Sequence, residues 1–189
     1  MAILKIARMG HPVLKASAAP VEDPTAPEIA TLVENMIETM IDASGTGLAA
    51  PQVHVPLRLV IFKVYPGRDP SEDGEDKGVP LTVLINPEIE PLSEDKEAGW
   101  EGCLSLPGMM GEVERFTHIR YSAYDLEGNR FVREAKGFHA RVVQHECDHL
   151  DGILYPYRIE DMDRFGFTEE LTRTDGDDEG RENQADTGE

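Results

Sequence analysis

The sequence predicts an α+β fold in which mainly antiparallel sheets surround a central metal-binding helix, with another helix near the N-terminus. Three observations lead to this prediction. Apolar residues recur at helical spacing between residues 26 and 43, β-branched runs bounded by proline or turn residues follow, and a His-Glu-x-x-His motif occupies residues 145–149. The order helix, strands, helix is typical of this class.

The N-terminal region is expected to be an extended arm followed by a helix. Prolines interrupt residues 6–22, which indicates a strap packed on the domain. Thr25 followed by Glu28 is a capping-box signature, and Pro27 lies in the first turn, where a missing N–H costs nothing. One helical face then carries the apolar residues Ile29, Leu32, Val33, Met36, Ile37, Met40 and Ile41. A helix over residues 26–43 is therefore expected.

The middle of the chain predicts strands. Short runs rich in β-branched and aromatic residues end at prolines or turn residues. The expected strands cover residues 57–65, 81–86, about 88–92, 118–126 and 130–135, and a turn at 127–129 joins the last two into a hairpin. The acidic segment from Pro66 to Pro80 is expected to be a mobile loop.

Length and composition indicate one globular domain. The chain has 189 residues, of which 40% are hydrophobic and 29% are charged. From Glu169 onward the chain is acidic and polar, and after Leu171 it is nearly free of large apolar residues. We therefore assign residues 1–167 to a catalytic domain and residues 168–189 to an acidic tail that we expect to be disordered.

Charge and hydropathy argue against several partners. The 18 basic and 37 acidic residues give a formal net charge of -19, which opposes direct binding to nucleic acid or to anionic lipid. No apolar run approaches the roughly 20 residues that a membrane span needs, and residues 1–8 lack the apolar core of a signal peptide. We therefore expect a cytoplasmic protein without membrane contact. Two cysteines do not make a disulfide framework.

A helix predicted over residues 137–151 carries the chemistry. His145 and His149 lie one turn apart on a single face, and Glu146 lies beside them. Two imidazoles and a neighbouring carboxylate are the groups needed to hold one metal ion and supply one general base. The motif therefore predicts a metal-dependent hydrolase.

The residues before the motif extend its face. Phe138 and Val142 fall on the same helical face as His145, so we expect a hydrophobic pocket beside the metal. Cys147 falls on another face, and we interpret it as a small core residue.

A catalytic metal of this kind needs a third protein ligand and an open position. Tyr155 stands where the metzincin pattern requires its last histidine, so that class of protease is excluded. A thermolysin-like glutamate ligand would have to come from Glu160, Glu169 or Glu170. Ligand chemistry favours Cys103, because a thiolate with two imidazoles suits iron(II), zinc, cobalt or nickel. Both alternatives remain open at this point.

Three segments together resemble the signature motifs of the peptide deformylase family. They are residues 45–52 (GTGLAAPQ), 101–105 (EGCLS) and 144–149 (QHECDH). The similarity extends through the arm at residues 10–14 (GHPVL) and covers about residues 4–167. The three motifs occur in order in a chain of the expected size, so the resemblance is specific.

The resemblance implies removal of the formyl group from the N-terminal formyl-methionine of nascent polypeptides, with release of formate. By similarity three residues hold the metal: Cys103, His145 and His149. A metal-activated hydroxide would attack the formyl carbonyl while Glu146 shuttles the proton. The side-chain amide of Gln52 and the backbone N–H of Leu104 would stabilise the oxyanion. Family analogy favours Fe2+, with Zn2+, Ni2+ or Co2+ as possible substitutes.

The same resemblance assigns the substrate-binding residues. Gly47 would lend backbone hydrogen bonds to the peptide, and Phe138, Val142 and Gly45 would line the pocket for the methionine side chain. The partners would be N-formyl-Met peptides and, transiently, the ribosome.

One position departs from the family pattern. Many members carry an arginine two residues after the Pro-Gly pair, whereas this chain has Met110. Arg115 and Arg141 are candidate replacements, although we interpret each as a surface cation.

Two other functions remain to be distinguished. One is a peptidase of the thermolysin type with a downstream glutamate ligand. The other is a formyl-peptide-binding protein without turnover, which the presence of Gln52, Cys103 and Glu146 disfavours because a binder does not need a general base.

Overall fold

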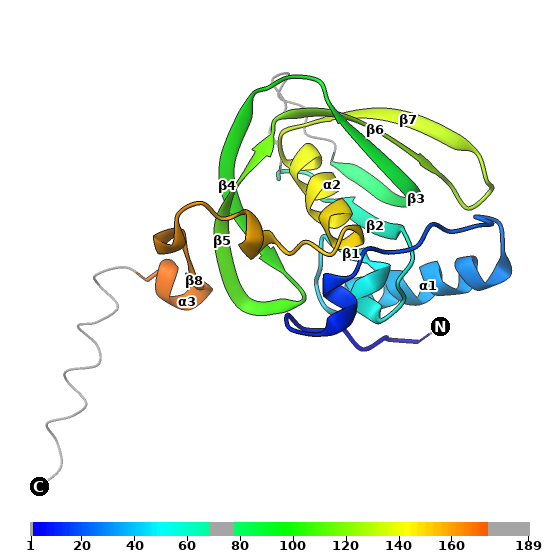
Figure 1. Cartoon of the computed structure of the whole chain (residues 1–189), viewed down its shortest axis with the longest axis horizontal. Coiled ribbons are helices and arrows are strands. Elements are labelled where there is room, and N and C mark those ends of the chain that lie inside the picture. Colours follow the sequence, from blue (N-terminus) through cyan, green and yellow to red (C-terminus); the bar gives the residue numbers. More distant parts are fainter. Residues whose placement is uncertain (1, 69–77, 174–189) are drawn as a thin grey trace, which may run out of the picture.

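The computed structural model of the chain describes residues 2–68 and 78–173. Figure 1 shows a central helix, α2 (Gly137–Leu150), with sheet strands on both sides of it, which confirms the predicted α+β class. The remaining helices are α1 (Pro27–Asp42) and α3 (Thr168–Leu171), with single 3-10 turns at η1 (Pro12–Lys15), η2 (Ala50–Val53), η3 (Tyr155–Arg158) and η4 (Met162–Arg164). The strands are β1 (Gly47–Ala49), β2 (Leu59–Val64), β3 (Val79–Pro91), β4 (Lys96–Cys103), β5 (Leu106–Phe116), β6 (His118–Tyr124), β7 (Arg130–Lys136) and β8 (Phe165–Phe167).

A five-stranded antiparallel sheet, in the order β1-β2-β3-β6-β7, separates the two long helices. Successive side chains of a strand point to opposite faces, and β2 uses both faces. Leu59 and Ile61 pack in the cluster that contains Met36 and Met40 of α1. Val60, Phe62 and Val64 pack in the cluster that contains Ala140, Val143, Cys147 and Leu150 of α2. The helix with the histidine motif is thus fixed on one face of a strand that is buried at every residue except Lys63.

Strand β3 is longer than predicted. Residues 81–86 and 88–92 were expected to be separate pieces because Pro87 cannot donate a ladder hydrogen bond. The structure instead accommodates Pro87 in an irregularity between Ile85 and Glu88, where Asn86 has a φ of 52°. Both polar groups of the Asn86 amide bond to the backbone of Val21, at 2.8 and 2.9 Å, so the irregularity is tied to the N-terminal arm.

A second sheet, in the order β4-β5-β8, was not predicted. Its main hairpin pairs Lys96 with Phe116 and continues to Gly102 opposite Met110. Figure 1 shows β4 and β5 on the side of α2 opposite β2 and β3. Cys103 is the last residue of β4.

The ends of the helices agree only in part with expectation. The proposed capping box of α1 is wrong: Ala26 is the N-cap, and the Thr25 hydroxyl donates to Asp23 at 2.7 Å instead. Gly152 follows the end of α2, in agreement with the helix predicted over residues 137–151. It has a φ of 71°, and Gly152 and Ile153 donate to the carbonyls of His149 and Asp148, a Schellman motif.

The first residues of the expected tail form a short helix. Residues 168–171, which we assigned to the tail, form α3 after β8 has paired with β5. Most of the predicted loop at 66–80 and most of the predicted tail fall on residues 69–77 and 174–189, outside the described residues. Among the helices that the structure describes, none is long and apolar enough to cross a membrane.

Candidate metal centre and substrate cleft

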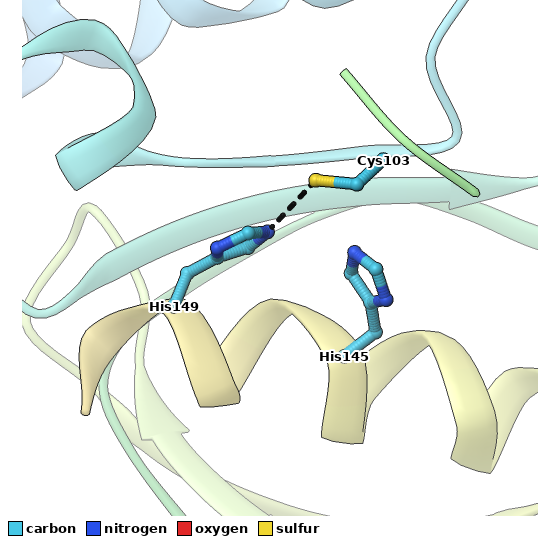
Figure 2. Close-up of side chains that lie close together, drawn as sticks. All are labelled: Cys103, His145 and His149. Atoms are coloured by element: carbon cyan, nitrogen blue, oxygen red, sulfur yellow. Dashed lines mark hydrogen bonds between the residues drawn. The ribbon is translucent and has the colours of Figure 1, made fainter. Parts of the chain in front are cut away.

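Cys103, His145 and His149 converge between β4 and α2. Figure 2 shows the two imidazoles rising from the helix toward the thiol above them. The ligand atoms of the three side chains lie within 4.8 Å of one another, and Cys103 Sγ is 3.4 Å from His149 Nε2. Ligands bound about 2.0–2.3 Å from one tetrahedral ion are roughly 3.5 Å apart, so this spacing fits a single metal.

The downstream glutamates do not join this group. Among the described residues, the clustering of potential metal ligands comprises the thiol and the two imidazoles, without Glu160, Glu169 or Glu170. The thermolysin-type ligand set is therefore not supported by the structure.

The charges and hydrogen bonds around Cys103 favour its thiolate form. Burial alone would raise the pKa of Cys103, but the positive charge of His149 and hydrogen bonds from His145 and His149 hold it well below its ordinary value. Burial opposes protonation of His145, whereas hydrogen bonds to Cys103 and Glu101 raise its pKa. Such a thiolate is the form that binds a metal, which would take the place of the imidazolium proton.

Glu101 fixes the orientation of His145. Its Oε2 lies 2.8 Å from His145 Nδ1, and its side chain is only 4% exposed. An ionised carboxylate only accepts, so Nδ1 must carry the proton and Nε2 is left free to bind a metal. Tyr155 adds a second restraint, because its buried ring stacks on His145 with centroids 6.1 Å apart.

We did not single out Glu101 from the sequence. The available signal was its position two residues before Cys103 in one strand, which places both side chains on the same face.

Two arginines hold Glu101 in place and are not the free surface cations that we expected. Arg115, 4% exposed, donates to both carboxylate oxygens at 2.9 Å, and Arg141 donates to Oε1 at 3.0 Å. Arg115 also binds Asp148 at 2.6 Å, and Arg158 binds the same carboxylate through two bonds of 2.6 Å. A chain of alternating charges thus runs from the surface to His145. Burial would raise the pKa of Glu101, but its hydrogen bonds with Arg115 and His145, together with their positive charges, hold it well below its ordinary value.

Glu146 lies beside the three potential ligands in a pocket built by Gly47. Glu146 as a whole is 5% exposed, its Oε2 has no hydrogen-bond partner among the described residues, and burial raises its pKa to about 7. A Cβ atom at Gly47 would overlap the Glu146 carboxyl group. Glycine at this position is therefore required for the carboxyl group to occupy its place.

The side-chain amide of Gln52 is oriented by its neighbours. Gln52 Oε1 accepts a hydrogen bond of 2.8 Å from the Ala49 backbone, so Nε2 is identified as the donor end. Nε2 lies 3.1 Å from Ser105 Oγ and 3.4 Å from Cys103 Sγ. A fixed N–H donor therefore lies next to the thiolate.

A cleft of about 910 Å³ opens above these groups. Nine of the ten residues that we predicted for the site line it: Gly45, Gly47, Gln52, Cys103, Leu104, Phe138, Val142, His145 and Glu146. The tenth, His149, is 2% exposed. A Cβ atom at Gly45 would lie 2.8 Å from a methyl carbon of Leu104, so the two loops pack tightly here.

Further lining residues were not anticipated. The strap expected over residues 6–22 contributes Ile6 and Arg8, and the residues before it contribute Ile3, Leu4 and Lys5. The opposite hairpin contributes Trp100 and Met109. Extended segments without periodicity carry no sequence signal for such a contact.

The fold and this centre are those of a metallohydrolase, with one thiol and two imidazoles grouped as a candidate metal site. Comparison with known proteins identifies a single family. The family model of polypeptide deformylase matches residues 3–165, and the chain belongs to the peptide deformylase family. It is accordingly a metal-dependent hydrolase of the deformylase type.

Relatives and solved structures agree with this membership. Peptide deformylase 1 of Bordetella pertussis is 57% identical over 166 residues, 88% of this chain and 93% of the relative. Peptide deformylase 2 of Ralstonia nicotianae is 55% identical over 170 residues, which cover 89% of this chain and 94% of the relative. A class I type b peptide deformylase from Acinetobacter baumannii superposes with a TM-score of 0.76 at 36% identity, over 83% of this chain and 99% of that one.

Proposed function

We propose that this protein hydrolyses the N-formyl group from the formyl-methionine that begins nascent polypeptides, releasing formate. The observation that carries the proposal is the grouping of Cys103, His145 and His149 next to the buried carboxyl group of Glu146 on the floor of a cleft. A structure of the Acinetobacter baumannii relative is described as bound to Met-Ala-Ser, a peptide of the kind that deformylation leaves.

Cys103, His145 and His149 would hold one divalent metal. Their spacing, the lowered pKa of the thiol and the tautomer imposed on His145 by Glu101 all fit this role. When bound, the metal supplies Lewis acidity and activates a water molecule near neutral pH. We propose Fe2+ as the native ion, with Zn2+, Ni2+ and Co2+ as competent replacements.

Glu146 would act as general base and then as general acid. It takes a proton from the attacking water and delivers it to the amine that leaves with methionine. A pKa of about 7, raised by burial, suits both halves of this task because the group can accept and release a proton near neutral pH.

Gln52 and Leu104 would stabilise the oxyanion that forms on the formyl oxygen. The Gln52 amide is held with its N–H end toward Cys103 Sγ, at 3.4 Å. Leu104 follows Cys103 directly, so its backbone N–H is fixed relative to the same atom. Donors held in place before the reaction stabilise the transition state without reorganisation.

Phe138, Val142 and Gly45 would form the wall of the methionine pocket, and Gly47 would offer its backbone to the peptide. All four line the cleft, and the guanidinium group of Arg68 lies 5.5 Å from the centroid of the Phe138 ring. An unbranched apolar side chain suits a pocket wall that contains Phe138 and Val142.

The protein would act in the cytoplasm on nascent chains, with transient access to the ribosome. The formal charge of -19 opposes docking on ribosomal RNA, so contact through the peptide is favoured. Residues 1–167 would form the catalytic domain, and the tail would have no part in the chemistry.

The decisive experiment measures formate release from a formyl-Met peptide with anaerobically purified, metal-analysed protein. We expect turnover by the wild type, a loss of at least about 100-fold in Glu146→Ala, and no change in Glu160→Ala. A metal-loaded wild type that binds the peptide without releasing formate would establish a binding protein instead. A Glu146→Ala variant as active as the wild type would exclude the proton-transfer role.

A further inference from the structure

We propose that Arg8, on the N-terminal arm, is a specificity-determining residue that binds an anionic group of the substrate downstream of its formyl-methionine. The proposal rests on the proposed deformylase function and adds a substrate preference to it: peptides with a carboxylate near the end of the cleft. Arg8 is exposed and lines the cleft.

The backbone around Arg8 is held against the reaction centre. Ala7 N–H donates to the Gln52 carbonyl at 2.7 Å, and Met9 N–H donates to the Ser105 carbonyl at 2.9 Å. Ser105 lies two residues after Cys103, and two residues of chain span at most about 7 Å. The arm therefore joins both loops that carry the proposed oxyanion donors, and it presents Arg8 between the two anchors.

The other arginines near the cleft are already engaged. Arg141 donates four hydrogen bonds, to Glu101 Oε1 and to the carbonyls of Gly99, Val113 and Glu97. Arg115 is buried in its ion pairs with Glu101 and Asp148 and does not line the cleft. Arg68 is placed over the ring of Phe138, at the wall of the methionine pocket.

Arg8 differs from these in having an uncommitted guanidinium group. Within residues 2–68 and 78–173, its side chain takes part in no ion pair or hydrogen bond. Lys5 also lines the cleft, but the Leu4 N–H bonds Thr39 Oγ1 of α1 at 2.8 Å, which places Lys5 toward the α1 end. A guanidinium group can hold a carboxylate through two parallel bonds, which an ammonium group cannot.

The test compares formyl-Met-Ala-Ser as a free acid with the same peptide as a C-terminal amide. We expect the wild type to prefer the acid. In Arg8→Gln, KM for the acid should rise about three- to tenfold, the loss expected for one charge-assisted contact at an exposed rim, with kcat within about twofold. KM for the amide should barely change, and Arg8→Lys should recover part of the preference.

Two variants provide matched controls. Lys15→Gln removes a positive charge from the same arm at a residue outside the cleft, and Lys5→Gln removes one inside it. We expect neither to change the ratio of the two KM values. Equal KM in Arg8→Gln and wild type, an equal shift for acid and amide, or a shift in Lys5→Gln alone would each overturn the proposal.

Calorimetric binding of Met-Ala-Ser and its amide to the metal-loaded protein tests Arg8 without turnover. If the wild type releases no formate but binds the acid more tightly than the amide, and Arg8→Gln abolishes this difference, the deformylase proposal is refuted and the anion-binding role of Arg8 is supported. If the wild type releases formate but Arg8→Gln leaves peptide binding unchanged, the deformylase proposal is supported and the anion-binding role of Arg8 is refuted.

Discussion

At position 47 the absence of a side chain makes room for the carboxyl group of Glu146. The Gly47→Ala substitution should therefore displace Glu146 and lower kcat by about 100-fold or more, the usual contribution of a positioned acid–base group. Metal content should stay unchanged, because no ligand is touched. Formate release and metal analysis on the same sample would measure both quantities.

Gly166→Ala is the matched control for that substitution. A Cβ atom there meets only the side chain of Leu171, at 3.5 Å, an ordinary contact. We expect the control to keep full activity. If Gly47→Ala were equally active, the carboxyl group could occupy another position without loss.

Substitution of the two cysteines should have opposite effects on metal content. Cys103→Ala should lose its metal, since the variant retains only two imidazoles, whereas Cys147→Ala should retain it. Cys147 is 7% exposed in the core cluster beneath α2, and burial raises the pKa of its thiol. Its truncation should cost about 1 kcal/mol of unfolding free energy. Metal content after gel filtration decides the matter, and equal loss in both variants would refute the ligand assignment.

The site residues were predictable where chemistry fixes the residue type. A thiol and two imidazoles are recognisable ligands, and the structure brings them together, although their roles stay predictions. Arg115 and Arg141 were misread because an arginine carries no sign in the sequence of whether it is buried. That depends on Glu101 and Asp148, which lie 14 and 33 residues from Arg115 and meet it only after folding.

Among the elements, the hairpin of β4 and β5 is joined to α2 through the carboxylate of Glu101. Glu101→Gln should weaken metal retention by about 10- to 100-fold, because a neutral amide no longer enforces the tautomer of His145. It should also destabilise the fold, since Arg115 keeps only Asp148 as an ionised partner. The rate of metal transfer to a chelator and the melting temperature report the two effects separately.

Glu97→Gln supplies the control for the same strand. This residue is exposed on β4, and it is the backbone carbonyl that accepts from Arg141. Metal retention should match the wild type. A Glu101→Gln variant that releases metal no faster than this control would contradict the positioning role.

The two long helices and strands β2 and β6 were predictable because their residues bury one or both faces. Strand β7 is mostly exposed and was predictable from the turn that joins it to β6. Strand β4 was not predictable, since five of its eight residues are exposed and two are glycines. Strand β5 was not predictable either, since Pro107 and two glycines interrupt its alternation. The two strands are held by pairing with each other, and register between distant residues leaves no local periodic signal. The capping box failed for a related reason: Asp23 offered the Thr25 hydroxyl a closer acceptor.

For the whole molecule, the described residues contain the complete candidate site. Deletion of residues 174–189 should therefore leave metal content and kcat/KM within about twofold of the full chain. Kinetics and metal analysis on the truncated protein would measure this. A large loss of either would assign the C-terminal segment a part in the site and would refute the domain boundary.

The position of α2 between two sheets leaves the segment from Gln144 to Leu150 without an exposed residue: six of the seven are buried, and the half-buried His145 lines the cleft. Each residue has its own contacts. Gln144 bonds to Phe116, His145 bonds to Glu101, and Glu146 lies beside Gly47. Asp148 forms ion pairs with Arg115 and Arg158, His149 lies near Cys103, and Cys147 and Leu150 pack in the core. Tolerance to substitution along an amphipathic helix normally rises and falls every 3.6 residues. Here we expect no such periodicity, because all seven consecutive positions should tolerate substitution poorly. Sequence variation in this protein should therefore be concentrated outside this segment.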